Sequence, residues 1–254
     1  MSKIFFTQIK NTTLTVLLTI LFAQRVGAQT EIPEYSKGDI IIEHSGYVLS
    51  FNESHRQANW VAYELTKKEA LGTFPRKNNF RVDPEIPAIT ALPSDYKGTD
   101  FDRGHLAPAG DMAWSKEAME ESFYMSNISP QYYSFNRGAW KKLESLIRGW
   151  AIEYESLYIT TAGVLEEELP QIGAENSVSV PNKFYKVVLD YRAPEFKAIG
   201  FIMPNKKISN SLEEYVCTVD HVETVTGINF FHHLEDKIEN HLESNLDLSL
   251  WKWE

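Results

Sequence analysis

An apolar stripe between Trp140 and Tyr154 constrains the fold of this chain more than any other stretch. At about 100° per residue, one face of a helix over this range carries the apolar side chains of Trp140, Leu143, Ile147, Trp150, Ala151 and Tyr154. Asn136 falls within the same arc, Glu144 lies at its edge and Arg148 lies one step beyond it. Polar groups beside a buried stripe cost free energy unless they have partners. We therefore expect Asn136 to cap this helix and, with Glu144, to face a polar pocket at the edge of the domain.

The segment Asp102-Arg103-Gly104-His105 supplies one imidazole at the end of a predicted strand, 101–106, which stops at Pro108. A free imidazole has a pKa near ~6.5, so it can accept a proton from water at neutral pH. Gly104 leaves the backbone free to bring His105 close to a ligand. An isolated histidine more often has a structural role. His105 is therefore a candidate general base only together with other groups.

Asn136 and Glu144 each have two interpretations. An asparagine that precedes a helix is usually an N-cap, but its carbonyl oxygen is also a suitable ligand for Mg²⁺, which takes few protein ligands. Glu144 could hold water around such an ion or pair with Arg148 one turn later. One general base and one oxygen-ligand metal site are what hydrolysis of a phosphodiester requires.

Alternation, β-branched content and turn residues predict an α+β fold of mostly antiparallel sheets flanked by helices. A hairpin over 39–51 turns at Ser45-Gly46, and prolines in 75–100 predict a long surface excursion. The further predicted strands are 60–65, 101–106, 125–128, 158–161, 184–191 and 196–203, and the predicted helices are 115–123, 136–154, 221–226 and 230–242.

Residues 1–28 have the pattern of an export signal. Lys3 and Lys10 precede a ten-residue apolar run, 14–23, which is too short for a membrane span of about 20 residues. We expect cleavage after Ala28, an uncleaved anchor being the alternative. The mature chain, 29–254, is then one domain without stable membrane insertion, exported to the periplasm or medium. Cys217 is the only cysteine, so its core holds it together without an intramolecular disulfide.

The acidic charge balance argues against a protein that coats nucleic acid without sequence preference. The formal net charge is −10 and becomes −13 without the three cations of residues 1–28. Basic residues occur only in local clusters, which are Arg76-Lys77 with Arg81, Arg137 with Lys141-Lys142 and Arg148, and Lys183 with Lys186. A nuclease remains compatible with this balance, because the field at a site is set locally and a divalent cation adds its own charge.

Several other enzyme classes lack their sequence signatures. HExxH, paired CxxC and phosphate-binding glycine-rich motifs are missing, which argues against zinc proteases and nucleoside triphosphatases. No serine stands in a G-x-S-x-G context. His232, His233 and His241 fall in the predicted last helix without the spacing of a zinc site, so we interpret them as surface residues.

Three motifs in order then resemble the DNA/RNA non-specific endonuclease family, which includes the secreted sugar-non-specific nucleases and endonuclease G. They are DRGHLAPA at 102–109, SNISPQ at 126–131 and NRG at 136–138, the last followed by Trp140, Leu143 and Glu144. Weaker similarity extends over most of the mature chain. The resemblance implies a ββα-metal motif whose strands are 101–107 and 125–128 and whose helix begins at Asn136.

The resemblance also assigns roles at the matching positions. It makes His105 the proton acceptor, Asn136 the direct protein ligand of Mg²⁺ (Mn²⁺ or another divalent cation being alternatives), and Glu144 the anchor of water around the ion. Arg148 matches an arginine that steadies the phosphate or leaving group. Arg103 and Asn127 fall on motif positions that shape the site. The implied substrates are DNA and RNA, and the implied products end in 5′-phosphate and 3′-hydroxyl.

Two departures from the family pattern bear on the site. Gly110 stands where many relatives have alanine, which we expect to be harmless. The family tends to place a substrate-binding arginine shortly before the aromatic that Phe80 matches, and here Arg76 and Lys77 are the candidates. A phosphodiesterase for smaller nucleotides and a catalytically silent binding module remain as alternatives, and the sequence leaves a homodimer open.

Overall fold

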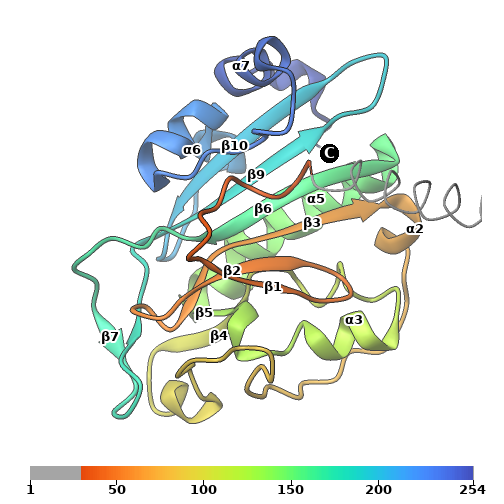
Figure 1. The fold of residues 1–254 in the computed structure, drawn as a ribbon. Coiled ribbons are helices and arrows are strands. Elements are labelled where there is room, and N and C mark those ends of the chain that lie inside the picture. The colour runs from red at the N-terminus through yellow and green to blue at the C-terminus, as the bar shows by residue number, and fades with distance from the viewer. Residues whose placement is uncertain (1–29, 254) are drawn as a thin grey trace, which may run out of the picture. The chain divides into compact units, whose positions relative to one another are not determined.

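The computed structural model describes residues 30–253, whose central element is an antiparallel sheet in the order β1-β2-β3-β6-β9-β10-β11 (Figure 1). Its strands are β1 (Ile40–Glu43), β2 (Val48–Asn52), β3 (Gln57–Thr66), β6 (Ser156–Gly163), β9 (Lys183–Asp190), β10 (Lys197–Pro204) and β11 (Val216–Cys217). This sheet confirms the predicted α+β class with mostly antiparallel pairing. The predicted export signal lies outside the described residues.

Two small sheets and several helices complete the fold. Strand β4 (Phe101–His105) pairs with β5 (Ile128–Tyr132), and β7 (Gln171–Ile172) pairs with β8 (Val178–Ser179). The helices are α2 (Lys67–Ala70), α3 (Lys116–Glu121), α4 (Tyr133–Phe135), α5 (Lys141–Tyr154), α6 (Val219–Thr226) and α7 (Asp236–Ser244). Shorter turns are η1 (Pro93–Tyr96), η2 (Met125–Asn127), the π-helical η3 (Asn136–Trp140), η4 (Leu212–Tyr215) and η5 (Leu248–Leu250). None of the helices described is long and apolar enough to cross a membrane.

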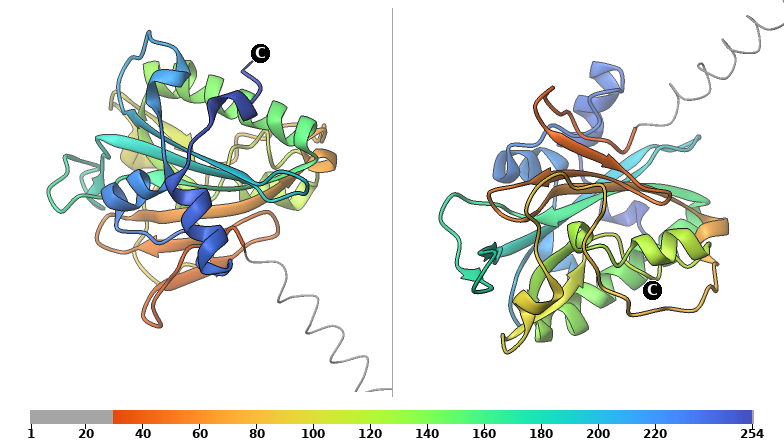
Figure 2. Two further views of the ribbon diagram at one scale, coloured as in Figure 1. Left: turned by 90° about the horizontal axis from the view of Figure 1, so that it is seen from above. Right: turned by 60° about the horizontal axis from the view of Figure 1, so that its bottom comes forward.

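Helix α5 covers one face of the large sheet, and α6 and α7 lie on the other (Figure 2). Successive residues of a strand point to opposite faces, and the contacts follow this rule. Phe184 of β9 lies 5.6 Å from the ring of Trp140 on the α5 side, whereas its neighbour Tyr185 lies 6.0 Å from Phe230. Gly200 of β10 faces α6, because a Cβ there would lie 2.7 Å from the Val222 side chain.

The apolar stripe of α5 forms the predicted interface with the sheet. Trp140, Leu143, Ile147, Trp150 and Ala151 are all buried, and the Trp150 ring lies 6.3 Å from that of Phe201 on β10. Tyr154 is only half-buried. Burying a large apolar side chain contributes about 1.5–3 kcal/mol, so this face fixes the position of the helix on the sheet.

The second strand of the predicted ββα motif is shifted from its expected place. The sequence predicted a strand over 125–128 that stops at Pro130, but Met125–Asn127 form a 3₁₀ turn and β5 runs through the proline. Pro130 is opposite Arg103 in a two-stranded sheet. Both strands of such a pair are edges, where the missing proline N–H is tolerated.

The start of α5 also differs from the prediction. Asn136 is not an N-cap, because it has helical torsions (φ −54°, ψ −50°) and follows the short helix α4. It begins a π-helical turn in which Gly138 departs from helical geometry (φ −105°, ψ −110°). Single π-helical turns occur often at functional sites.

The last predicted helix, 230–242, begins later in the structure than the sequence predicted. Residues 230–235 are not helical, and α7 begins only at Asp236. Phe230 and Phe231 are buried in the core, and Phe231 has a positive φ of 50°, which a helix does not accommodate. His232 and His233 therefore precede the helix, and of the three histidines only His241 belongs to it.

One buried side chain attaches the β4–β5 pair to the large sheet. Asn205, just after β10, donates from Nδ2 to the carbonyls of Pro130 (3.1 Å) and Pro181 (2.9 Å). Its Oδ1 accepts the N–H of Tyr132 at 2.9 Å. The amide thus satisfies three backbone groups, two from β5 and one from the segment just before β9.

We predict that Asn205→Ala lowers the free energy of unfolding by about 3 kcal/mol, because it leaves buried backbone donors and acceptors unpaired. Urea unfolding of the wild type and the variant measures this difference. Asn210→Ala is the matched control, since Asn210 is exposed, and it should change stability by less than about 0.5 kcal/mol. Equal stability of the Asn205→Ala protein would show that the amide does not hold the two sheets together.

Candidate active site

A cleft of about 600 Å³ lies between the end of β4 and the first half of α5. It contains most of the residues that the sequence singled out. The side chains that line it are those of Arg76, Phe80, Asp102, Arg103, His105, Pro108, Ala109, Gly110, Asn136, Arg137, Lys141, Glu144, Ser145 and Arg148. Strand and helix thus contribute to one site, as the two separated motifs predicted.

His105 is the last residue of β4 and is only 8% exposed. Its ring packs edge-on against Phe123, with centroids 4.9 Å apart, and lies 5.5 Å from Phe80. Burial, with a smaller contribution from the charge of Arg76, lowers the pKa of His105 to about 3. The Nε2 atom is buried and has no hydrogen-bond partner among residues 30–253. The imidazole is therefore neutral at pH 7 and has a free nitrogen.

Asn127 holds the end of β4 in place. Its Oδ1 accepts the N–H of Ala107, and its Nδ2 donates to the carbonyls of Ala107 and Ser122, each at 2.9 Å. The carbonyl of Asn127 accepts the N–H of Leu106. The asparagine thus fixes the backbone that follows His105, in keeping with the supporting role that the resemblance implied.

The structure gives a different reason for glycine at position 104 from the one predicted. A Cβ at this position would lie 2.3 Å from the Oε1 atom of Gln131 on the paired strand. The glycine therefore makes room for a buried protein side chain rather than for a ligand.

Asn136 is oriented by Asp102. Its Nδ2 donates to Oδ2 of Asp102 at 2.9 Å, and Arg137 forms a bidentate pair with the same carboxylate at 2.8 and 2.6 Å. Although burial acts to raise the pKa of Asp102, the hydrogen bonds from Arg137 and Asn136 lower it below its usual value. Asp102 is thus a carboxylate that accepts the amide N–H₂, which leaves the Asn136 carbonyl oxygen for another partner.

Glu144 lies two turns further along and is half-buried in the cleft. It forms no ion pair with Arg148, whose guanidinium pairs with Asp111. Burial raises the pKa of Glu144, and the charges of Lys186 and, less strongly, Arg148 oppose this effect. Lys186 itself is 1% exposed on β9, with its Nζ 4.7 Å from the Trp140 ring. Burial lowers its pKa.

Arg148 is held by Asp111 instead. Its Nε and Nη2 donate to Oδ1 of Asp111 at 2.7 and 2.6 Å, and the Tyr63 hydroxyl donates to Oδ2 at 2.8 Å. Asp111 is 1% exposed, so a buried carboxylate holds the guanidinium in place. The two contacts with Asp111 use one edge of the guanidinium and leave Nη1 for a ligand.

Gly110, one departure from the family pattern, lies against the guanidinium of Arg148. A Cβ there would lie 2.6 Å from Nη2 and 2.9 Å from Cζ of Arg148. The space of an alanine methyl is therefore taken by this guanidinium, which would have to shift if residue 110 were larger. That glycine in place of alanine is harmless here stays a prediction.

The cleft is locally positive although the chain is acidic. Its lining contains the cations Arg76, Arg103, Arg137, Lys141 and Arg148 but only two carboxylates, Asp102 and Glu144. The Arg103 guanidinium stacks on the Phe80 ring at 4.3 Å. Of the two candidates for the second arginine position, Arg76 lines the cleft, whereas Lys77 is exposed and lies 3.8 Å from Glu120.

Sequence reasoning did not identify Asp111, Lys186 or Tyr63 as part of the site. Asp111 follows the DRGH motif by a few residues, and Lys186 was noted only as a member of a basic cluster. No local pattern connects them with α5. Their proximity to Arg148 and Glu144 results from the packing of the helix on the sheet.

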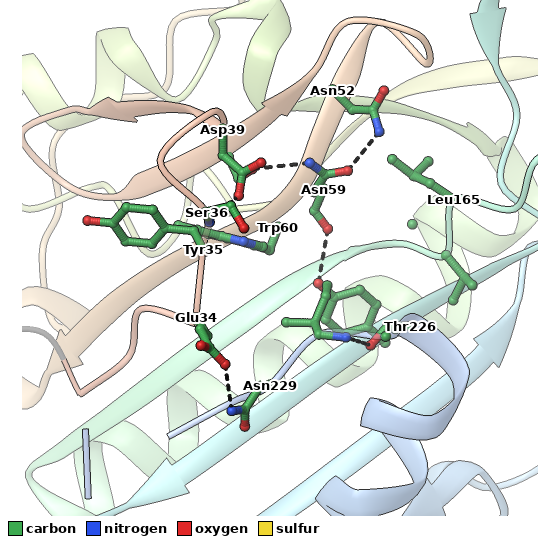
Figure 3. Close-up of a pocket in the computed structure, with 16 residues that line it drawn as sticks. Glu34, Tyr35, Ser36, Asp39, Asn52, Asn59, Trp60, Leu165, Thr226 and Asn229 are labelled. Atoms are coloured by element: carbon green, nitrogen blue, oxygen red, sulfur yellow. Dashed lines mark hydrogen bonds between the residues drawn. The ribbon is translucent and has the colours of Figure 1, made fainter. Parts of the chain in front are cut away.

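A second cavity, of about 380 Å³, opens on the other face of the sheet (Figure 3). Trp60, Tyr185, three asparagines and the carboxylates of Glu34 and Asp39 line it, whereas lysine, arginine and histidine are missing from its lining. It contains none of the predicted site residues and does not suit a phosphate ligand.

The donor set of the cleft fits a hard divalent cation. Asn136 has an amide oxygen turned away from Asp102, and the Glu144 carboxylate has no hydrogen-bond partner within the described part of the chain. Oxygen ligands of this kind suit Mg²⁺, Mn²⁺ or Ca²⁺ and not a thiolate-seeking metal.

Comparison with known proteins gives consistent matches. Residues 27–237 match the family model described as DNA/RNA non-specific endonuclease. The chain is 34% identical to mouse mitochondrial nuclease EXOG over 76% of its length and 34% identical to nuclease C1 of Cunninghamella echinulata, also over 76%. A chain in the crystal structure of an EndoG/EndoGI complex superimposes with a TM-score of 0.75 and 31% identity, over 84% of this chain and 94% of that one.

The extent of the matches differs among relatives. The match covers 57% of mouse EXOG and 60% of the zebrafish protein, so the chain spans less than two thirds of these relatives. It covers 83% of nuclease C1 and 76% of a nuclease from a Nostoc strain, to which it is 33% identical.

The buried histidine predicts a pH dependence of stability. Its pKa is about 3 in the folded chain and near 6.5 when exposed, so the unfolded chain binds the proton more tightly. The stability that a neutral His105 contributes is present above pH ~6.5 and is lost as the pH falls toward 3, by up to about 1.4 kcal/mol per pH unit. His105→Gln should flatten the curve of unfolding free energy between pH 7 and pH 4.

Urea unfolding at several pH values measures this slope, and His241→Gln, which removes an exposed imidazole, is the control. An unchanged slope in the His105→Gln protein would contradict the burial of a neutral imidazole.

Proposed function

Because this chain belongs to the DNA/RNA non-specific endonuclease family, we propose that it is a Mg²⁺-dependent endonuclease that cleaves DNA and RNA with little base specificity. Membership makes it a nucleic-acid hydrolase. The observation that carries the finer proposal is the composition of the cleft, where a neutral imidazole, two oxygen donors and an excess of cations meet. Backbone phosphates are the part of a nucleic acid that every sequence shares.

His105 is the general base of the proposed reaction. Its unprotonated ring accepts a proton from water as the water oxygen attacks phosphorus. The bond from phosphorus to the 3′ oxygen breaks, and the leaving 3′ oxygen takes a proton from solvent. A phosphodiester bound nearby brings negative charge, which raises the pKa of His105 and makes it a stronger base. The products carry a 5′-phosphate and a 3′-hydroxyl.

Asn136 and Glu144 are the proposed holders of the cation, Asn136 directly and Glu144 through water. When bound, Mg²⁺ would neutralise charge on the phosphoryl and leaving oxygens. Arg148, fixed by Asp111, donates from its free edge to the phosphate. Arg103 and Arg76 bind the substrate backbone along the cleft.

The domain and location proposals rest on the sequence. We propose that residues 1–28 are a cleaved export signal and that 29–254 form one nuclease domain, which is consistent with the compact unit Glu31–Glu254. The animal EXOG relatives carry the name mitochondrial. N-terminal sequencing of the protein recovered from the periplasm or medium of its host distinguishes export from retention.

We predict that the chain nicks a supercoiled plasmid in the presence of Mg²⁺, that EDTA abolishes the activity, and that His105→Ala reduces its rate by about 10²–10⁴-fold, the usual contribution of a general base. His241→Ala is the matched control and should retain the wild-type rate. Full activity of the His105→Ala protein would refute the assignment of the base.

A second comparison separates the role of Asn136 from that of His105. Asn136→Ala should require a higher Mg²⁺ concentration for half-maximal nicking, because it removes the direct ligand, whereas His105→Ala should not shift this concentration. Hydrolysis of mononucleotide esters in preference to plasmid would favour the smaller-substrate alternative, and no hydrolysis of either would favour a silent binding module.

A further inference from the structure

Three carboxylates lie together on α6 and α7, away from the cleft. Asp220 and Glu223 are in the first turns of α6, and Glu243 is near the end of α7. One oxygen from each lies within 4.8 Å of the others. Glu243 is only 6% exposed, and its Oε1 is buried without a hydrogen-bond partner in the described part of the chain. A polar atom so placed normally has a partner.

The arrangement is electrostatically unfavourable as it stands. No lysine, arginine or histidine forms an ion pair with any of the three carboxylates among residues 30–253. Glu223 uses its Oε1 to accept the N–H of Phe230 at 2.8 Å, and its side chain also lies within hydrogen-bond reach of Glu243. Like charges at this separation, with one of them buried, require a compensating cation or proton.

We propose that Asp220, Glu223 and Glu243 bind a divalent cation, preferentially Ca²⁺, that joins α7 to α6. Ca²⁺ accepts six to eight oxygen ligands in flexible geometry, including carboxylates, whereas Mg²⁺ demands a regular octahedron and retains its waters. Three carboxylates from two separate helices, one of them exposed, match the less demanding ion. Asp220 on the exposed side leaves room for water ligands.

This site is separate from the one in the cleft. Helix α6 packs on the face of the sheet opposite α5, as the contact between Gly200 and Val222 shows. The cation therefore stabilises the C-terminal helices and takes no part in phosphodiester hydrolysis. It also gives part of the acidic excess of the chain a structural role.

The alternative occupant is a proton. Burial and the neighbouring Glu223 raise the pKa of Glu243 to about 8, so an uncharged Glu243 could share a hydrogen bond with Glu223. The two possibilities predict different responses to metal, because a carboxyl pair that shares a proton is not stabilised by Ca²⁺.

The test measures thermal unfolding of the Asn136→Ala protein, a background that removes the direct ligand of the cleft. Chelated protein is titrated with CaCl₂ or MgCl₂ at fixed ionic strength and pH 7.5. We expect saturating Ca²⁺ to raise Tm by about 5 °C or more, Mg²⁺ to have a smaller effect, and the added substitution Glu243→Gln to abolish the Ca²⁺ response. Asp236→Asn, which removes an exposed carboxylate of α7 outside the trio, should retain it.

Calorimetric titration with Ca²⁺ gives a second readout that does not depend on unfolding, with one bound ion expected per chain and none after Glu243→Gln. The absence of a Ca²⁺-dependent shift, or an equal shift in the Glu243→Gln protein, would overturn the proposal and favour the shared proton. Glu223→Gln, which keeps an oxygen for the Phe230 N–H, covers the case in which Glu243→Gln fails to fold.

Discussion

The burial of one face of α5 on the large sheet is the interaction on which the rest of the structure depends. Trp140 packs against Phe184 of β9, and Trp150 packs against Phe201 of β10. With both ends of the helix anchored in this way, its rotation about its own axis is fixed. The residues at the edge of the apolar stripe must then project toward the end of β4, where His105 lies. A small rotation of α5 would move its polar edge away from the imidazole, so the arrangement of the candidate site is a consequence of core packing.

Polar groups beneath the cleft are stabilised by one another. Asp111 accepts hydrogen bonds from Arg148 and Tyr63, and Lys186 compensates the charge of Glu144. Each of these side chains would be costly to bury alone. The positive lining of the cleft, in a chain with a formal charge of −10, comes from its five cations, which exceed the two carboxylates beside them. Carboxylates that lie elsewhere, such as those of α6 and α7, account for the acidic balance without weakening the site.

The predictive value of the sequence differed from residue to residue. The helical period of the α5 stripe and the β-branched and aromatic content of the large strands are local patterns, and the elements that they predicted were confirmed. The second strand of the motif was misplaced because Pro130 suggested an end, whereas an edge strand accommodates it. Asn136 was expected to cap a helix because that is what asparagines usually do, and α4 before it excludes the role. Residues 230–235 were expected to be helical, yet burial of Phe230 and Phe231 bends the chain instead.

By itself the sequence determined which chemical groups are present, that His105 ends a strand, and that Glu144 and Arg148 share one side of a helix. These properties follow from the side-chain period of each element, which is readable over a few residues. Only the tertiary structure decided that Asp111 anchors Arg148, that the charge of Lys186 acts on Glu144 and that Gly110 makes room for a guanidinium. Such contacts join residues far apart in the chain. They depend on strand order and on the rotation of α5 against the sheet, neither of which leaves a trace in local sequence.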